Sequence, residues 1–173
     1  MPDQIKEAFG KVVSTAGALK AEAPTLGFHN GACLLGGYLK QGGQFSFTVA
    51  INDPTGYAAL VGTYGNDSEV ELTVKDSSGK NLVTDSDERG SLFEPKSKGR
   101  HTIVAKNKGG DTFVAVALVR ESGGVTHSFA GVNTAVAGIG AGIKNSFGDG
   151  YSAPTNQLMV LGSVIAPGAT YGQ

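Results

Sequence analysis

Four carboxylates flank a short stretch of alternating apolar and polar residues, and oxygen ligands of this kind suit a calcium ion. Asp67 and Glu69 stand at the start of the stretch, whereas Asp85 and Asp87 follow it. Calcium takes about six to eight oxygen ligands at roughly 2.3–2.6 Å, which carboxylates and loop carbonyls can supply. We therefore expect these four residues to be the ligands of a structural Ca²⁺, the one cofactor that the sequence suggests.

The predicted hairpin around residues 76–79 would bring the four carboxylates together. Residues two apart on a strand lie on the same face, about 7 Å apart. If the hairpin closes through residues 76–79, Lys75 lies opposite Lys80 and position 68 falls near position 86. The alternative interpretation is a solvated acidic rim that keeps a sheet edge soluble.

Cys33 and nearby His29 are the residues that could serve a thiol nucleophile. Such catalysis also needs an orienting group and an oxyanion site, and no recognisable signature surrounds the pair. Cys33 opens an apolar segment, so we expect a small buried hydrophobe. His101 is expected to face inward with Ile103 as a core histidine, and His127 lies in a predicted loop without an acidic neighbour in sequence.

Other motifs of catalysis or nucleotide binding do not stand out. The glycines of residues 138–142 lack the preceding strand and distal acidic residue of a dinucleotide fingerprint. No Gly-x-Ser-x-Gly motif occurs, although serine, histidine and aspartate are all present. The sequence predicts no catalytic residues, and a small hydrolase using Cys33 or a serine is kept as the least favoured alternative.

Two helices are expected to flank the strands. Residues 3–21 carry one apolar stripe at three- and four-residue spacing, with Asp3 as a plausible N-cap and Pro24 just beyond the end. Residues 131–144 keep a helical period despite three glycines, each of which costs about 1 kcal/mol relative to alanine in a helix. The first helix is expected to cover one face or end of a sheet.

Between residues 33 and 120 the pattern changes to a period of two. Short apolar segments alternate with turn residues, which is typical of an antiparallel sandwich or barrel. The expected strands are residues 44–51, 57–64, 69–75, 81–84, 91–93, 100–106 and 112–120. Residues 113–119 are apolar on both faces, which indicates a strand covered on both sides.

The predicted fold is mainly β: an antiparallel, jelly-roll-like β-sandwich of about eight strands with an N-terminal helix and a second helix near 131–144. The 173 residues fit a single domain, with residues 1–30 as a helical extension, 33–121 as the sandwich and 122–173 as a glycine-rich segment plus a C-terminal strand. Because 40% of residues are apolar and 17% are charged, disorder is excluded. The net charge of −1 without a basic stripe argues against nucleic-acid binding.

Two segments near opposite ends of the chain are similar in sequence. Residues 33–42 resemble residues 159–168, and each copy follows a predicted helix. Either the chain holds one unit plus the first strand of another, or the two segments occupy similar edges of one sheet. Chance similarity between short apolar segments is the third interpretation.

Residues 34–121 resemble the bacterial pre-peptidase C-terminal (PPC-like) domain. The resemblance rests on an ordered series of short motifs: residues 35–39 with Gly42, then 45–47, 69–74 with 76–79, 93–95, 99–103 and 113–118. It implies a jelly-roll β-sandwich that serves as a secreted accessory module, calcium-stabilised in some relatives. The chain departs from the family at Glu69 and Glu71, where Asp-x-Asp is usual, and at His101, where an aromatic residue is common.

We therefore expect a non-catalytic, extracytoplasmic accessory or binding module that recognises a protein or a cell-surface or extracellular polymer. The segment after Met1 lacks the basic and apolar regions of a signal peptide, so any export signal is expected outside these residues. No stretch is apolar and long enough for a membrane span. The second hypothesis is a structural subunit that forms homo-oligomers by β-strand addition through its C-terminal strand.

Overall fold

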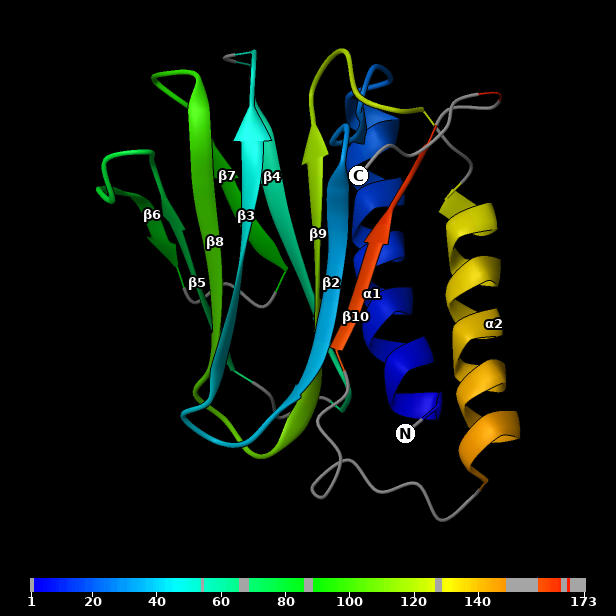
Figure 1. Cartoon of the computed structure of the whole chain (residues 1–173). Helices are drawn as coiled ribbons and strands as arrows, with labels where there is room; N and C mark the ends of the chain where they lie inside the picture. The colour runs from blue at the N-terminus through cyan, green and yellow to red at the C-terminus, as the bar shows by residue number, and fades with distance from the viewer. Residues whose placement is uncertain are drawn as a thin grey trace.

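The computed structural model describes residues 2–53, 55–65, 69–85, 89–126, 129–148, 159–165 and 168. These residues form a mainly β structure with two helices, as predicted (Figure 1). In chain order the elements are α1 (Pro2–Glu22), β1 (Gly27–Phe28), β2 (Ala32–Leu39), β3 (Gln44–Ile51), β4 (Tyr57–Thr63), β5 (Val70–Lys75), β6 (Asn81–Asp85), β7 (Gly90–Phe93), β8 (Gly99–Asn107), β9 (Thr112–Arg120), α2 (Phe129–Phe147) and β10 (Met159–Ser163).

Eight strands, β2 to β9, form the predicted jelly-roll sandwich. Sheet A has the order β10-β2-β9-β4-β7, with β1 also paired to β9, and sheet B has the order β3-β8-β5-β6. Nearly every connection carries the chain from one sheet to the other, which is the winding of a double-sheet jelly roll. The strand pairs are antiparallel, as the alternating pattern of the sequence predicted.

Helix α1 covers the outer face of sheet A, where it packs on β4 and β9. Its apolar stripe is fully buried at Ile5, Phe9, Val12 and Ala16. Strand β9 is consequently buried at all of its positions, between α1 on one face and the sandwich core on the other. The molecule therefore has three layers: sheet B, sheet A and the helices.

Glycines in sheet A allow α1 to approach closely. A Cβ atom on Gly62 of β4 would lie 2.1 Å from the carbonyl oxygen of Ala8. A Cβ atom on Gly36 of β2 would lie 2.8 Å from ring atoms of both Phe9 and Phe113. Any side chain at these positions would displace the helix or its aromatic residues.

Helix α2 packs on α1 in the antiparallel direction, confirming the second helix (Figure 1). Val132 and Val136 are buried, and Phe129 packs its ring against Phe28 with 5.3 Å between centroids. Burial of this stripe offsets the low helix propensity of the glycines. None of the helices in the described ranges is long and apolar enough to cross a membrane.

The two similar segments at the ends of the chain are neighbours in one sheet. Strand β10 pairs with β2 at the edge of sheet A, so that Leu161 lies opposite Leu35 and Val160 opposite Gly36. This pairing favours the interpretation that both segments occupy one edge of a single sheet. One hydrophobic cluster includes residues from Ile5 to Val164.

Candidate functional site

A groove lies between α1 and strand β7, at the edge of sheet A opposite β10. Its larger part is a cavity of about 470 Å³. It is lined by Leu19, Glu22, Ala23, Leu26, Gly56, Tyr57, Ala58, Leu92, Phe93, Glu94 and Glu121. We call this cavity, together with its smaller continuation described below, the α1–β7 groove.

The groove exists because sheet A extends one strand beyond the helix. Ala58 of β4 lies opposite Leu92 of β7, and opposed residues share a face of the sheet. That face is the one on which Gly62 meets α1, because positions 58, 60 and 62 alternate together. Since α1 packs on β4 and β9, Leu92 remains 73% exposed and forms the outer wall.

A second cavity of about 260 Å³ continues the groove along α1. It shares Leu19, Ala58 and Leu92 with the larger cavity and extends past Leu60 to Arg89. The wall contributed by α1 runs from Thr15 to Ala23, a length of about 12 Å at the helical rise per residue. The floor is therefore apolar and elongated.

Three glutamates line the larger cavity, and one of them, Glu22, also lines the smaller one. Glu22 is the last residue of α1, Glu94 follows β7 and Glu121 follows β9, and all three are exposed. The Glu121 backbone N–H donates to the Gly56 carbonyl oxygen at 2.8 Å. A Cβ atom on Gly56 would lie 2.9 Å from Glu121 Oε2, so this glycine makes room for the carboxylate. The ion pairs found in the described residues involve other carboxylates, namely Glu7, Glu71 and Asp53.

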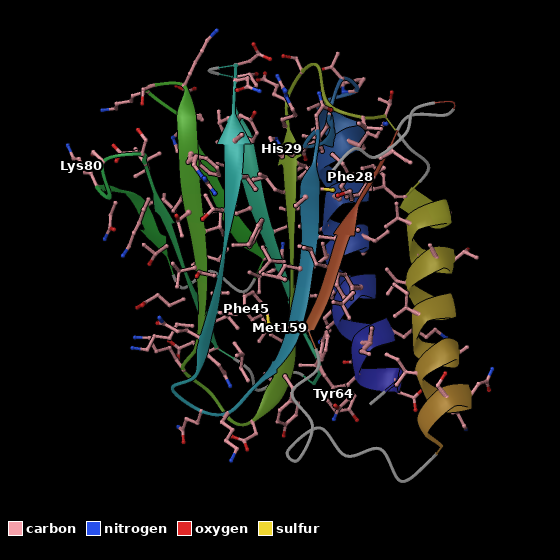
Figure 2. The ribbon with its side chains drawn as sticks, in the orientation of Figure 1. Phe28, His29, Phe45, Tyr64, Lys80 and Met159 are labelled. Atoms are coloured by element: carbon pink, nitrogen blue, oxygen red, sulfur yellow. The ribbon has the colours of Figure 1, made fainter. Side chains whose placement is uncertain are left out.

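A buried polar cluster fixes this end of the sandwich from the other face of sheet A. Arg120 Nη2 donates to Asp53 Oδ2 at 3.1 Å, and the guanidinium lies over the Tyr57 ring at 5.6 Å from its centroid. Tyr57 stacks on Phe93 with 5.6 Å between ring centroids. His29 lies 5.9 Å from the Tyr57 ring at the end of the sandwich where β9 finishes (Figure 2).

The electrostatics of this cluster keep its histidine neutral. Burial, and then the nearby Arg120 charge, lower the pKa of His29 to about 4. Burial likewise raises the pKa of the Tyr57 hydroxyl, against the opposing effect of Arg120. His29 Nδ1, Tyr57 Oη and Arg120 Nε are buried without a hydrogen-bond partner among the described atoms. Sequence reasoning missed this cluster, because Arg120 and Asp53 are far apart in the chain and each resembles an ordinary strand-end or turn residue.

The predicted calcium ligands fall largely outside the described residues. Asp67 and Asp87 lie there, as does the side chain of Asp85. Glu69 is exposed, and its carbonyl oxygen accepts hydrogen bonds from the backbone N–H groups of Lys108 and Gly109. Within the described part of the chain, no group of three or more potential metal ligands gathers. The four-carboxylate site stays a prediction.

The hairpin register predicted for this region is wrong. Lys75 lies opposite Asn81 rather than Lys80, and a β-bulge or irregularity between Val74 and Lys75 shifts the register further, so that Val74 lies opposite Val83. Asp85 consequently lies opposite Leu72, three residues along the strand from Glu69. At about 3.3 Å per residue, the backbone of Asp85 is therefore displaced by about 10 Å from that of Glu69 along the strand direction. Alternation revealed the strands, but it carries no information on the extra residue of a bulge.

The cysteine and histidines behave as the sequence predicted where they are described. Cys33 is fully buried, and burial raises the pKa of its thiol to about 11. His101 is fully buried with Nδ1 3.1 Å from the Gly99 carbonyl oxygen. His127 lies outside the described residues, and Gly138 and Gly142 belong to helix α2 rather than to a phosphate-binding loop.

Comparisons with known proteins offer no family. No protein-family model matches the chain, and no curated protein matches it. Among the solved structures that match is a family two carbohydrate esterase from Cellvibrio japonicus, with 12% sequence identity and a TM-score of 0.29. The match covers 56% of this chain and 30% of the esterase. The chain thus spans less than a third of that protein, and so loose a superposition carries no argument about function.

Proposed function

We propose that this chain is a non-catalytic binding module that acts outside the cytoplasm as an accessory unit, and that the α1–β7 groove is its recognition surface. The groove carries the proposal, because a preformed apolar cavity with a few charged groups at its rim is the usual form of a binding site. Its walls come from a helix and two strands. Sites on such elements hold their geometry better than sites on loops.

The lining of the groove supports a binding role. Apolar side chains of α1, β4 and β7 form most of it, and the glutamates of the larger cavity are exposed. The thiolate is the reactive form of cysteine, and burial disfavours that form at Cys33. The small-hydrolase alternative therefore has the weakest support.

The extracytoplasmic location and the accessory role rest on the resemblance of residues 34–121 to PPC-like domains. The jelly-roll order of the strands is consistent with that resemblance. The proposed structural Ca²⁺ rests on the donor chemistry of Asp67, Glu69, Asp85 and Asp87. The partner is a protein or an extracellular polymer, and the elongated apolar lining of the groove favours a segment of a protein chain.

Two matched substitutions test the groove as the recognition surface. Leu92→Lys places a charge in the groove, whereas Leu161→Lys does so at the opposite edge of sheet A, and the two leucines are 73% and 64% exposed. Peptides selected from a random display library for binding to the wild-type chain should also bind the Leu161 variant. Binding to the Leu92 variant should fall at least tenfold by fluorescence anisotropy. If library peptides bind all three proteins equally, or none of them, the groove is not the recognition surface.

A second candidate function is assembly by strand addition, which the exposed β10 edge favours. Met159 and Leu161 are 59% and 64% exposed on β10, whose other side is unpaired in the described sheets (Figure 2). Apolar side chains on such an edge suit pairing with a second copy. Deleting residues 157–173 or making Leu161→Lys should then shift the sedimentation coefficient, whereas Leu92→Lys should leave it unchanged. An unchanged profile for both β10 variants would reject this function.

A further inference from the structure

We infer that the α1–β7 groove takes an extended segment of a partner protein in which apolar side chains are flanked by lysine or arginine. This inference rests on the proposed function and names the chemistry of the ligand. It follows from the charges around the groove, the shape of its floor and the direction of α1.

The charged residues of the larger cavity are all acidic. Glu22, Glu94 and Glu121 line it, and no lysine or arginine does so in the described residues. The basic residue in the last turn of α1, Lys20, lies instead over the Phe129 ring on the α2 side, 5.4 Å from the centroid. A ligand in the larger cavity therefore meets carboxylates, whereas the basic residue that lines the groove in the described residues, Arg89, belongs to the smaller cavity.

The C-terminal end of α1 adds to the same field. Leu19, Glu22 and Ala23 line the cavity, so the last carbonyl groups of a 21-residue helix lie at this end of the groove. A helix C-terminus carries about half a negative charge and stabilises nearby cations. The helix and the glutamates thus favour the same kind of ligand group.

The floor of the groove demands apolar side chains as well. Leu19, Ala58 and Leu60 form it beside the wall contributed by Leu92, and Ala58 and Leu60 belong to the same face of β4. Along the roughly 12 Å that α1 contributes, an extended chain at about 3.3 Å per residue would place about four residues. A short segment with alternating cationic and apolar side chains satisfies both surfaces. Polyamines and other small cations would leave the floor uncovered.

Three labelled heptapeptides separate the contributions of charge and apolarity. SKLKLKS carries both features, SELELES reverses the charges and SKSKSKS lacks the leucines. We expect SKLKLKS to bind and to lose at least tenfold in affinity when all three glutamates are changed to glutamine, since exposed charge pairs contribute roughly two- to fivefold each. Binding should weaken as NaCl rises from 20 to 200 mM, because salt screens charges at the surface.

A matched variant distinguishes the site from the overall charge. Gln44→Lys, Ser46→Lys and Ala50→Lys change the net charge by the same three units at exposed positions of β3, outside the groove. This triple variant should bind SKLKLKS as the wild type does, within a factor of two. The converse variant, with Glu22, Glu94 and Glu121 changed to lysine, should instead bind SELELES. Because the altered side chains of both triple-lysine variants are exposed, both variants should retain the wild-type melting temperature.

The outcomes separate this inference from the proposed function. If unbiased library peptides bind at the groove but SELELES binds as well as SKLKLKS, the groove recognises a partner and the charge inference is wrong. If SKSKSKS binds as tightly as SKLKLKS, the ligand is a simple polycation and the apolar part is wrong. If no peptide responds to Leu92→Lys, the recognition surface itself is wrong.

Discussion

Sheet A and sheet B are both antiparallel, but their strands differ in burial pattern. In sheet A, β9 is buried at every position and β4 at every position except Thr63. In sheet B, β3 alternates strictly between exposed and buried residues, and β5 alternates between half-buried and buried residues. The helices account for the difference, because α1 covers the outer face of sheet A whereas the outer face of sheet B meets solvent.

This difference explains where the proposed recognition surface lies. A sheet between two layers reads as a continuous apolar run, and a sheet with one solvated face reads as an alternation. The α1–β7 groove occurs where sheet A, the middle layer, extends beyond α1 and leaves Leu92 exposed. Sheet A therefore combines the most completely buried strands, β4 and β9, with the candidate recognition surface. Substitutions of equal size should consequently affect the stability of the two sheets differently.

The largest difference is expected for one added methyl group. Gly62→Ala puts a Cβ atom 2.1 Å from the Ala8 carbonyl oxygen, so α1 must shift. We expect a loss of about 3 kcal/mol in the free energy of unfolding, measured by urea denaturation. Ser46→Thr adds one methyl group to the exposed face of β3 and should change stability by less than about 0.5 kcal/mol. Equal effects would contradict the three-layer account.

The contrast between the sheets was largely available from the sequence. The apolar run of residues 113–119 predicted a strand covered on both faces. The alternation in residues 44–51 predicted a strand with one solvated face. Alternation reflects only which side chains are buried. The order of apolar and polar residues in a single sequence is enough to reveal it. The β5–β6 register could not be obtained in this way, because the bulge beside Lys75 depends on turn geometry rather than on apolarity.

A second variant tests how the two sheets are held together. Asn107 at the end of β8 donates from Nδ2 to the Leu39 carbonyl at 3.2 Å and to the Gly110 carbonyl at 2.8 Å, and its Oδ1 accepts from the Gly109 N–H. Asn107→Ala leaves these buried groups unpaired and should cost about 2–3 kcal/mol in denaturant unfolding. The exposed Asn133 provides the control, since Asn133→Ala should be neutral or slightly stabilising within α2. A neutral Asn107 variant would mean that the sheets are joined by apolar packing alone.

Acid should affect sheet A through His29. Its pKa is about 4 in the folded chain and about 6.5 when unfolded, so the unfolded chain binds more protons between these values. Stability is therefore complete above about pH 6.5 and falls as the pH is lowered toward 4. Between pH 7 and pH 5 the expected loss is about 2 kcal/mol, measured by chemical denaturation at each pH. His29→Gln should remove most of this slope, and a variant with the wild-type slope would assign it to other groups.

The candidate site shows where sequence reasoning stops. The groove is built by leucines, alanines and glutamates between positions 19 and 121, none of which carries a motif. The cluster of His29, Tyr57 and Arg120 likewise depends on the pairing of β4 with β9, which one sequence does not specify. Such sites become visible once the strands are ordered, because their function lies in the arrangement and not in any single residue type.

The smallest expected effect concerns calcium at the open edge of sheet B. If Asp67, Glu69, Asp85 and Asp87 bind Ca²⁺ with the affinity of about 1 mM known for extracellular modules, 10 mM Ca²⁺ should stabilise the chain by about 1.4 kcal/mol. Calorimetric titration after chelation should show binding heat, and the melting temperature should rise by a few degrees. Asp67→Asn combined with Asp87→Asn should abolish both signals, whereas Glu121→Gln, just beyond the end of β9 in sheet A, should preserve them. Heat that survives the double substitution would place the ion elsewhere, and no heat at all would leave these carboxylates as a solvated rim.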